Sequence, residues 1–232
     1  MFGFGGSSVS TPLLRVLTDV HPLYALGTPL PVAIPTAVAG LVGYHRRGLV
    51  RYRIAGFTIL GGLPGVVVGA LLTKYIPASW LMIITGAALL GIGLRSALTA
   101  GGVAMAEIPI KPTSADLIAF LIGLPAGLFA GVLANGGGPV LVPMYLMFLN
   151  LPMLEAVATS LATVVVLSIP GAALHWWLGH VDPQLVLFLT IGVIPASLLG
   201  SKLARKLGDV RLKRVFGWAM VLFGGYFLWR EL

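Results

Sequence analysis

The sequence predicts an all-α integral membrane protein made of two inverted-topology repeats, and three observations lead to this prediction. First, hydrophobic residues make up 58% of the 232 residues and charged residues only 9%, whereas about a quarter of the residues in a soluble domain are charged. Second, several stretches without Asp, Glu, Lys or Arg have the length of a membrane span. Third, the two halves of the chain align with each other at a constant offset.

The predicted spans follow from these uncharged stretches, because about 20 predominantly apolar residues cross the roughly 30 Å of hydrocarbon in a bilayer. Residues 117–154 are too many for one helix, yet at about 1.5 Å per residue they are too few for two full spans and a turn. They contain "GGGP" at 136–139, and each glycine disfavours a helix interior by about 1 kcal/mol and proline by about 3 kcal/mol. We therefore expect a spanning helix over 116–134, a break, and a shorter returning helix. The other stretches are 22–44, 54–73, 75–94, 156–181, 183–201 and 215–229.

Basic residues are distributed unevenly between the connecting segments. Segments 45–53, 95–116 and 202–214 hold 12 of the 15 Lys and Arg residues. Cytoplasmic loops of membrane proteins carry such an excess, so we place these three segments in the cytoplasm and the C-terminus outside. The net charge of +8 is then explained by the cytoplasmic loops of a membrane protein. The expected partner is the lipid bilayer, and no binding to nucleic acid is expected. The expected location is the cell (inner) membrane, crossed several times.

An internal repeat relates the two halves. Residues 5–93 align without a gap with residues 136–224, with about twenty identities at an offset of 131 residues, and this agreement exceeds what composition alone gives. The basic loop 45–53 matches 176–184, which contains no Lys or Arg. The halves are therefore expected to cross the membrane in opposite directions, and inverted repeats with Gly/Pro-interrupted helices are typical of secondary transporters that bind substrate near the midplane.

The repeat also sets the expected domain boundaries. Each repeat should contain a Gly/Pro-broken helix followed by three spanning helices, and the first repeat lacks the leading helix that 116–134 supplies to the second. The expected divisions are a first repeat over 1–98, a cytoplasmic linker over 99–115 and a second repeat over 116–232.

Several sequence elements resemble the TauE/SafE (sulfite exporter) family of membrane anion transporters. They are "AGLFAGVLANGGGPVLVP", "AVATSLATVVV", "GAALHWWLGHVD" and "IPASLLGSKLARKL" in the second half, with weaker counterparts "GFGGSSVSTPLL", "ALGTPLPVA" and "HRRGLVRY" in the first. The resemblance implies multi-pass secondary transport of sulfite, a sulfonate or a related small organic anion. The first half departs from the pattern, because Ser7 replaces the third glycine and Thr28-Pro29 replaces Thr-Ser.

An anion site is expected at the two glycine-rich turns. Backbone N–H groups at a helix start lack internal partners and lie at the positive end of the helix dipole, so they bind anions. Glycine lets a substrate approach the backbone closely. The alternative is that the small residues only allow close helix packing. The candidate substrate-binding residues are Gly5, Gly6, Ser7, Thr28, Gly136, Gly137, Gly138, Thr159, Ser160 and His175.

His175 is a candidate because it lies within the apolar sequence "IPGAALHWW". An imidazole with a pKa near neutrality suits a proton relay or an anion contact. The alternative is an interfacial histidine beside Trp176 and Trp177, which would belong to an aromatic belt. Glu155 lies near the start of the same span. It could gate transport or couple it to protons, and the alternative is a solvated carboxylate at a helix start.

The sequence contains no sign of an enzyme, a cofactor or a metal site. It has no cysteine, no H-E-x-x-H motif and no Walker loop. Ser168 and His175 would be about 10 Å apart on one helix, which is too far for a nucleophile and its base. The hypotheses that remain are a secondary transporter that exports a small anion and, as the alternative, an anion channel. A second copy of the chain, forming a homodimer, is a further possible partner.

Overall fold

The computed structural model describes residues 10–11, 14, 20–98, 112–207 and 209–231, and within these residues every regular element is a helix. Five of the helices are long and apolar enough to cross a membrane, so the predicted membrane class is confirmed. The helices are α2 (Pro22–Gly27), α3 (Pro29–His45), α4 (Tyr52–Leu72), α5 (Ala78–Leu98), α6 (Pro112–Leu133), α7 (Gly138–Phe148), α8 (Met153–Trp177), α9 (Pro183–Leu207) and α10 (Asp209–Glu231).

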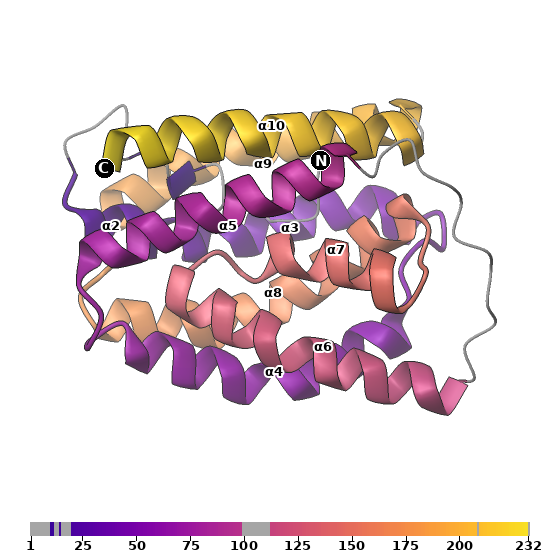
Figure 1. The fold of residues 1–232 in the computed structure, drawn as a ribbon, viewed down its shortest axis with the longest axis horizontal. Coiled ribbons are helices and arrows are strands. Elements are labelled where there is room, and N and C mark those ends of the chain that lie inside the picture. The colour runs from indigo at the N-terminus through magenta and orange to yellow at the C-terminus, as the bar shows by residue number, and fades with distance from the viewer. Residues whose placement is uncertain (1–9, 12–13, 15–19, 99–111, 208, 232) are drawn as a thin grey trace.

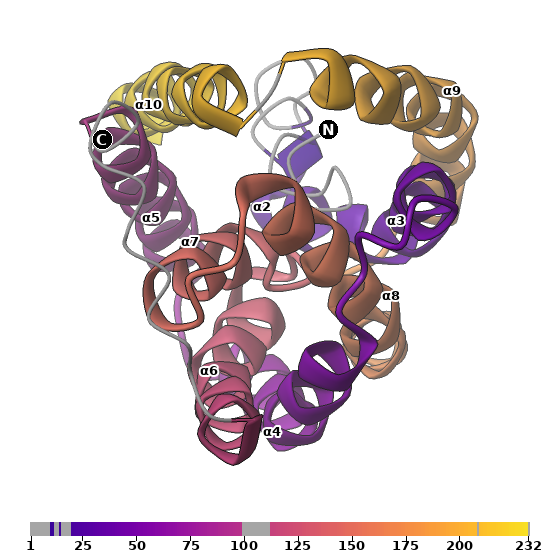
Figure 2. The same ribbon diagram turned by 90° about the vertical axis from the view of Figure 1, so that its right-hand side faces the viewer.

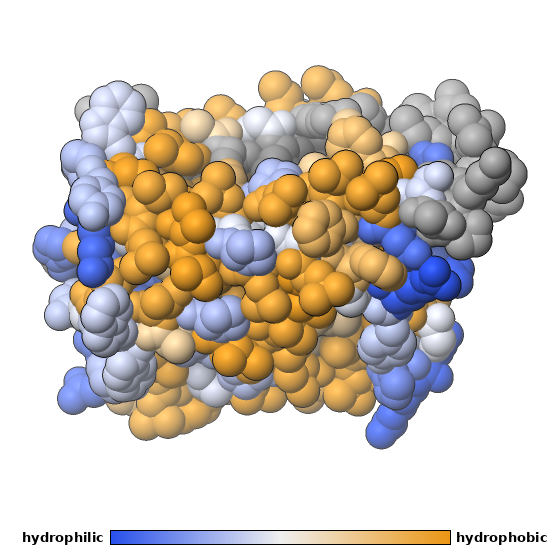
Figure 3. Space-filling model, turned by 90° about the horizontal axis from the view of Figure 1, so that it is seen from below, coloured by the Kyte–Doolittle hydropathy of each residue, from blue (hydrophilic) through white to orange (hydrophobic). Residues whose placement is uncertain are grey.

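The long helices lie side by side in one bundle (Figure 1). Seen along its length, α4 and α6 form one corner, α5 and α10 a second, and α3 and α9 a third, with α7 and α8 between them (Figure 2). Apolar side chains cover the middle of the face shown in Figure 3, and polar side chains gather at its two ends. This banding suits a bilayer that surrounds the middle of the bundle.

The connections between helices lie at two opposite ends of the bundle. The links α3–α4 and α7–α8 lie at the right-hand end in Figure 1, as do the end of α9 and the start of α10, and the links α4–α5 and α8–α9 lie at the left-hand end. The right-hand end is here called the basic end, after its exposed residues Arg46, Arg47, Arg51, Arg53 and Lys206. At the opposite end, Lys74 lies over the ring of Trp177, 4.7 Å from its centroid.

Helices α4 and α6 approach each other closely because glycines recur every four residues on both. Gly61, Gly65 and Gly69 of α4 face α6, and a Cβ atom at Gly65 would lie 2.7 Å from the carbonyl oxygen of Leu124. Gly127 of α6 would likewise contact the backbone of Gly62. Small residues at helix interfaces allow this approach in membranes, where packing replaces the hydrophobic effect as the driving force.

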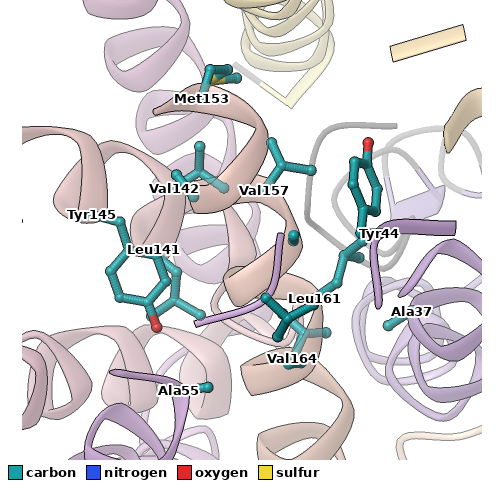
Figure 4. Close-up of a cluster of buried hydrophobic side chains, with 14 of the residues drawn as sticks. Ala37, Tyr44, Ala55, Leu141, Val142, Tyr145, Met153, Val157, Leu161 and Val164 are labelled. Atoms are coloured by element: carbon teal, nitrogen blue, oxygen red, sulfur yellow. The ribbon is translucent and has the colours of Figure 1, made fainter. Parts of the chain in front are cut away.

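Helix α7 is only 11 residues long, yet it lies in the main buried cluster. Its side chains Leu141, Val142 and Tyr145 are fully buried and pack with Val157 and Val164 of α8 (Figure 4). A short helix with buried apolar side chains is a returning segment inside the protein rather than a span. The backbone turn that precedes it is therefore enclosed by other helices.

Several helix boundaries differ from the expected ones, and two of these differences have a clear physical reason. Helix α6 begins at Pro112 rather than at 116, within the expected linker 99–115, because proline is well suited to the first helical turn. Helix α9 continues past 201 to Leu207, since Lys202 and Lys206 in its last turns are cations near the negative end of the helix dipole.

Candidate functional site

The break in the second half is a turn made of left-handed residues. After α6 ends at Leu133, φ is 47° at Ala134, 69° at Gly136 and 77° at Gly137. Glycine adopts this region without the steric cost that a Cβ atom brings. Three such residues within four positions reverse the chain, and α7 begins at Gly138.

Hydrogen bonds hold the turn and leave two of its donors unused. The buried side chain of Asn135 accepts a hydrogen bond from the N–H of Gly137 through Oδ1, at 3.0 Å. Pro139 lies in the first turn of α7, where its missing N–H has no consequence. Among the described residues, no hydrogen bond is found to the N–H of Gly136 or of Gly138. Both N–H groups lie at the positive end of the α7 dipole, where anions are favoured.

The turn lies at mid-depth in the bundle. A Cβ atom at Gly136 would lie 2.9 Å from Ser168 Oγ and 2.9 Å from Val164 Cγ1, so the turn packs directly against α8. Because α8 extends from Met153 to Trp177, Ser168 is near its middle. Irregular backbone at this depth is tolerated in a membrane where it is buried in protein or lines a wet cavity.

Two candidate residues, Thr28 and Thr159, lie towards opposite ends of the bundle. Thr159 Oγ1 accepts a hydrogen bond from the N–H of Arg51 at the basic end, at 3.1 Å. Thr28 Oγ1 accepts one from the N–H of Asp182 in the α8–α9 link, also at 3.1 Å. Both hydroxyls therefore connect the two halves of the chain. Along α8, Thr159 is about 13 Å from Ser168, so Thr159 does not lie at the glycine turn.

The other candidates are placed as follows. Ser160 is fully buried in α8. Gly5, Gly6 and Ser7, the expected first glycine turn, lie outside the described residues. The structure therefore brings together Gly136, Gly137 and Gly138 of the second turn, and it adds the nearby Asn135 and Ser168. From the sequence, Ser168 was weighed only as a nucleophile too far from His175. The spacing of residues along α8 gave no sign that its hydroxyl would face Gly136.

His175 is fully buried and has a partner on each ring nitrogen. Its Nε2 lies 2.8 Å from the carbonyl oxygen of Gly131, and its Nδ1 lies 3.2 Å from Nδ1 of His180. A carbonyl oxygen only accepts, so Nε2 carries the proton, Nδ1 is the acceptor, and His180 Nδ1–H is the donor. His175 thereby satisfies one of the free carbonyls in the last turn of α6, close to the turn but on the side away from the basic end.

Ion pairs join the helices at the basic end. Arg51 binds both carboxylate oxygens of Glu155, at 2.8 and 3.0 Å, and this hydrogen bonding raises the pKa of Arg51. Arg53 pairs with Asp116 at 2.7 Å. A surface hollow of about 350 Å³ lies between the starts of α4 and α6, bordered by these two arginines. Since both guanidinium groups are neutralised by carboxylates, the hollow does not present free positive charge to an anion.

A broken helix enclosed at mid-depth in a bundle of spanning helices is a feature of membrane transporters. The family model described as sulfite exporter TauE/SafE matches residues 1–227. The chain therefore belongs to the TauE/SafE family, which its sequence elements resemble.

Curated relatives agree with this assignment. The chain is 28% identical to the "Probable membrane transporter protein YunE" of Bacillus subtilis, over 97% of this chain and 90% of the relative. It is 28% identical to a "Probable membrane transporter protein" of Xylella fastidiosa, over all of this chain and 90% of the relative. It is 26% identical to the "Probable sulfite/organosulfonate exporter TauE" of Cupriavidus necator, over 80% of this chain and 74% of the relative. No solved structure matches the chain. The family and these relatives are membrane transporters, so the chain is a multi-pass membrane transporter and not an enzyme.

Proposed function

We propose that the protein is a secondary transporter that exports a small anion, such as sulfite, a sulfonate or a related organic anion. One observation carries the proposal: within the described part of the chain, the mid-depth turn leaves the N–H groups of Gly136 and Gly138 without hydrogen-bond partners at the start of α7. An anion at the turn would accept hydrogen bonds from these backbone N–H groups. The printed name of the Cupriavidus necator relative, a sulfite/organosulfonate exporter, gives the substrate class that we extend to this chain.

We further propose that the two halves are inverted repeats that alternate access to this site. In support, the helices of the second half begin 131 residues after those of the first, since Pro22, Tyr52 and Ala78 correspond to Met153, Pro183 and Asp209. Corresponding helices run in opposite directions, as α4 and α9 do in Figure 1. The links match as well, because Gly48 and Gly179 are both left-handed, with φ of 67° and 74°.

Reciprocal contacts support a two-fold relation between the halves. If two units are related by a two-fold axis, a contact from residue i of one unit to residue j of the other is accompanied by a contact from the equivalent of i to the equivalent of j. The Arg51–Thr159 hydrogen bond has such a counterpart in the Asp182–Thr28 hydrogen bond.

The same holds for packing. A Cβ atom at Gly40 would contact Ser197 and Leu161, and one at Gly171 would contact the equivalent residues Val66 and Leu30. In this proposal the two threonine hydrogen bonds close the basic end and the opposite end of the bundle, and transport requires each to open in turn. By the distribution of basic residues, the basic end is cytoplasmic.

Counterflow in liposomes tests the proposal against the alternative of an anion channel. Purified protein is reconstituted with unlabelled sulfite inside, and uptake of labelled sulfite against its own gradient is followed. A carrier exchanges one anion for another, so we expect transient accumulation of label. With equal K⁺ on both sides and valinomycin to hold the membrane potential at zero, a channel gives no accumulation of label. Conductance without accumulation under these conditions would overturn the transporter in favour of the channel.

A further inference from the structure

The hydroxyl of Ser168 differs from the other hydroxyls within the spanning helices. Thr36, Thr58 and Thr163 each donate to the carbonyl oxygen four residues earlier in their own helix, at 2.7–3.1 Å. Such local bonds are how serine and threonine are satisfied within a helix. Ser168 makes none: its side chain is fully buried, and its Oγ has no hydrogen-bond partner among the described residues.

This unpartnered hydroxyl faces the glycine turn. Its Oγ lies 2.9 Å from the place that a Cβ atom of Gly136 would occupy, so any other residue at 136 would press on the hydroxyl. In the same turn, the N–H groups of Gly136 and Gly138 have no partner within the part of the chain that the structure describes. Donors from two elements, α8 and the turn before α7, therefore lie together in the protein interior. A buried polar group without a partner destabilises the protein, and such a group indicates a ligand that completes it.

We propose that Ser168 is a substrate-binding residue, whose hydroxyl donates a hydrogen bond to an oxygen of a small oxyanion at the turn. This inference rests on the proposed transport function and specifies its substrate class. Hydroxyl and N–H donors on different elements suit an anion with several acceptor oxygens, such as sulfite or a sulfonate. The equivalent of Ser168 in the first half is Ala37, so only the second repeat supplies this donor.

The test compares Ser168→Ala with a matched serine variant. In detergent, the Kd for sulfite and for methanesulfonate is measured by calorimetry, and the melting temperature is measured without anion. Ser168→Ala should weaken the binding of both anions by about tenfold to a hundredfold, the effect of one hydrogen bond to a charged group. It should also raise the melting temperature of the anion-free protein, because a buried unpartnered hydroxyl is removed. Ser168→Cys, which keeps a weak donor, should give an intermediate Kd.

Ser197→Ala is the control, because Ser197 Oγ donates to the carbonyl oxygen of Thr36 at 2.8 Å. This variant should melt at a lower temperature and keep the Kd of the parent protein. If Ser168→Ala binds both anions like the parent protein, Ser168 is not a substrate-binding residue, and the proposed transport function is unaffected. If the parent protein itself binds neither anion and shows no counterflow, both proposals are wrong.

Discussion

At the scale of single residues, the three glycines after Asn135 do not have equal roles. Gly136 faces α8 and the Ser168 hydroxyl, whereas a Cβ atom at Gly137 would lie 2.9 Å from the carbonyl oxygen of Ala126 in α6. Any side chain at Gly137 would thus strain its left-handed backbone and also push α6 away. The proposed anion site therefore shares this turn with a packing contact, and variants of the neighbouring Ser168 test anion binding without changing the contact at Gly137.

The histidines at the end opposite the basic end predict a pH dependence of stability. His180 is buried in the α8–α9 link, and this burial, together with the nearby His21, lowers its pKa below the ordinary 6.5. Below about pH 6.5 the unfolded chain takes up a proton that folded His180 resists, so stability is full above that pH and falls as the pH decreases towards the lowered pKa.

We therefore expect the parent protein to melt at a lower temperature at pH 5 than at pH 7.5. His180→Gln does not titrate and should show a smaller decrease. Thermal unfolding at both pH values measures the difference, with His45→Gln as a control because His45 is exposed at the basic end. An equal decrease in the parent protein and in His180→Gln would show that other groups cause the pH dependence.

At the scale of elements, the glycines between α4 and α6 determine how close the two helices lie. Gly127→Ala should lower the melting temperature, because its Cβ atom would meet the backbone of Gly62 and force the helices apart. Gly56→Ala, also in a spanning helix, provides the matched control: a Cβ atom there meets nothing within 4 Å.

Gly56→Ala should stabilise the protein by up to about 1 kcal/mol, the difference in helix propensity between the two residues. Thermal unfolding of both variants in one detergent measures the contrast. If both variants melt at the same temperature, close packing of α4 on α6 does not contribute to stability.

At the scale of the whole molecule, the proposed inverted repeat predicts which ends of the helices share a side of the membrane. The chain has no native cysteine, so single cysteines report directly on sidedness. Cysteines that replace Arg47 and Lys206, which are exposed at the basic end, should react with an impermeant maleimide only from the cytoplasm. A cysteine that replaces Gln184, exposed at the opposite end, should react only from outside.

Labelling of intact and of opened cells measures each position. Arg47 lies in the α3–α4 link of the first half and Lys206 in the last turn of α9 in the second half. Both are at the basic end, so labelling from opposite sides would contradict the inverted arrangement. Cytoplasmic labelling of Gln184 would contradict it as well.

The sequence by itself determined the class, the family and the place of the break. Apolar stretches of span length specify membrane helices because a bilayer leaves no other partner for the backbone. "GGGP" specifies a break because glycine and proline disfavour helix interiors, and the elements around it carried the family resemblance. The expected stretch 183–201 begins where α9 begins, at Pro183, and α4 begins 131 residues earlier, at Tyr52 rather than at the expected 54.

Only the tertiary structure decided what each polar group contacts. Thr28 and Thr159 were predicted to bind substrate, yet they bond to the backbone of Asp182 and Arg51 in the opposite halves of the chain. Glu155 pairs with Arg51, more than a hundred residues away. Ser168 stands out because its hydroxyl is the one that finds no partner where Gly136 meets α8. Such partners come from chain segments that are distant in sequence and are brought together by helix packing. Hydrophobic periodicity and glycine spacing describe one helix at a time, so these sequence patterns do not specify contacts between helices.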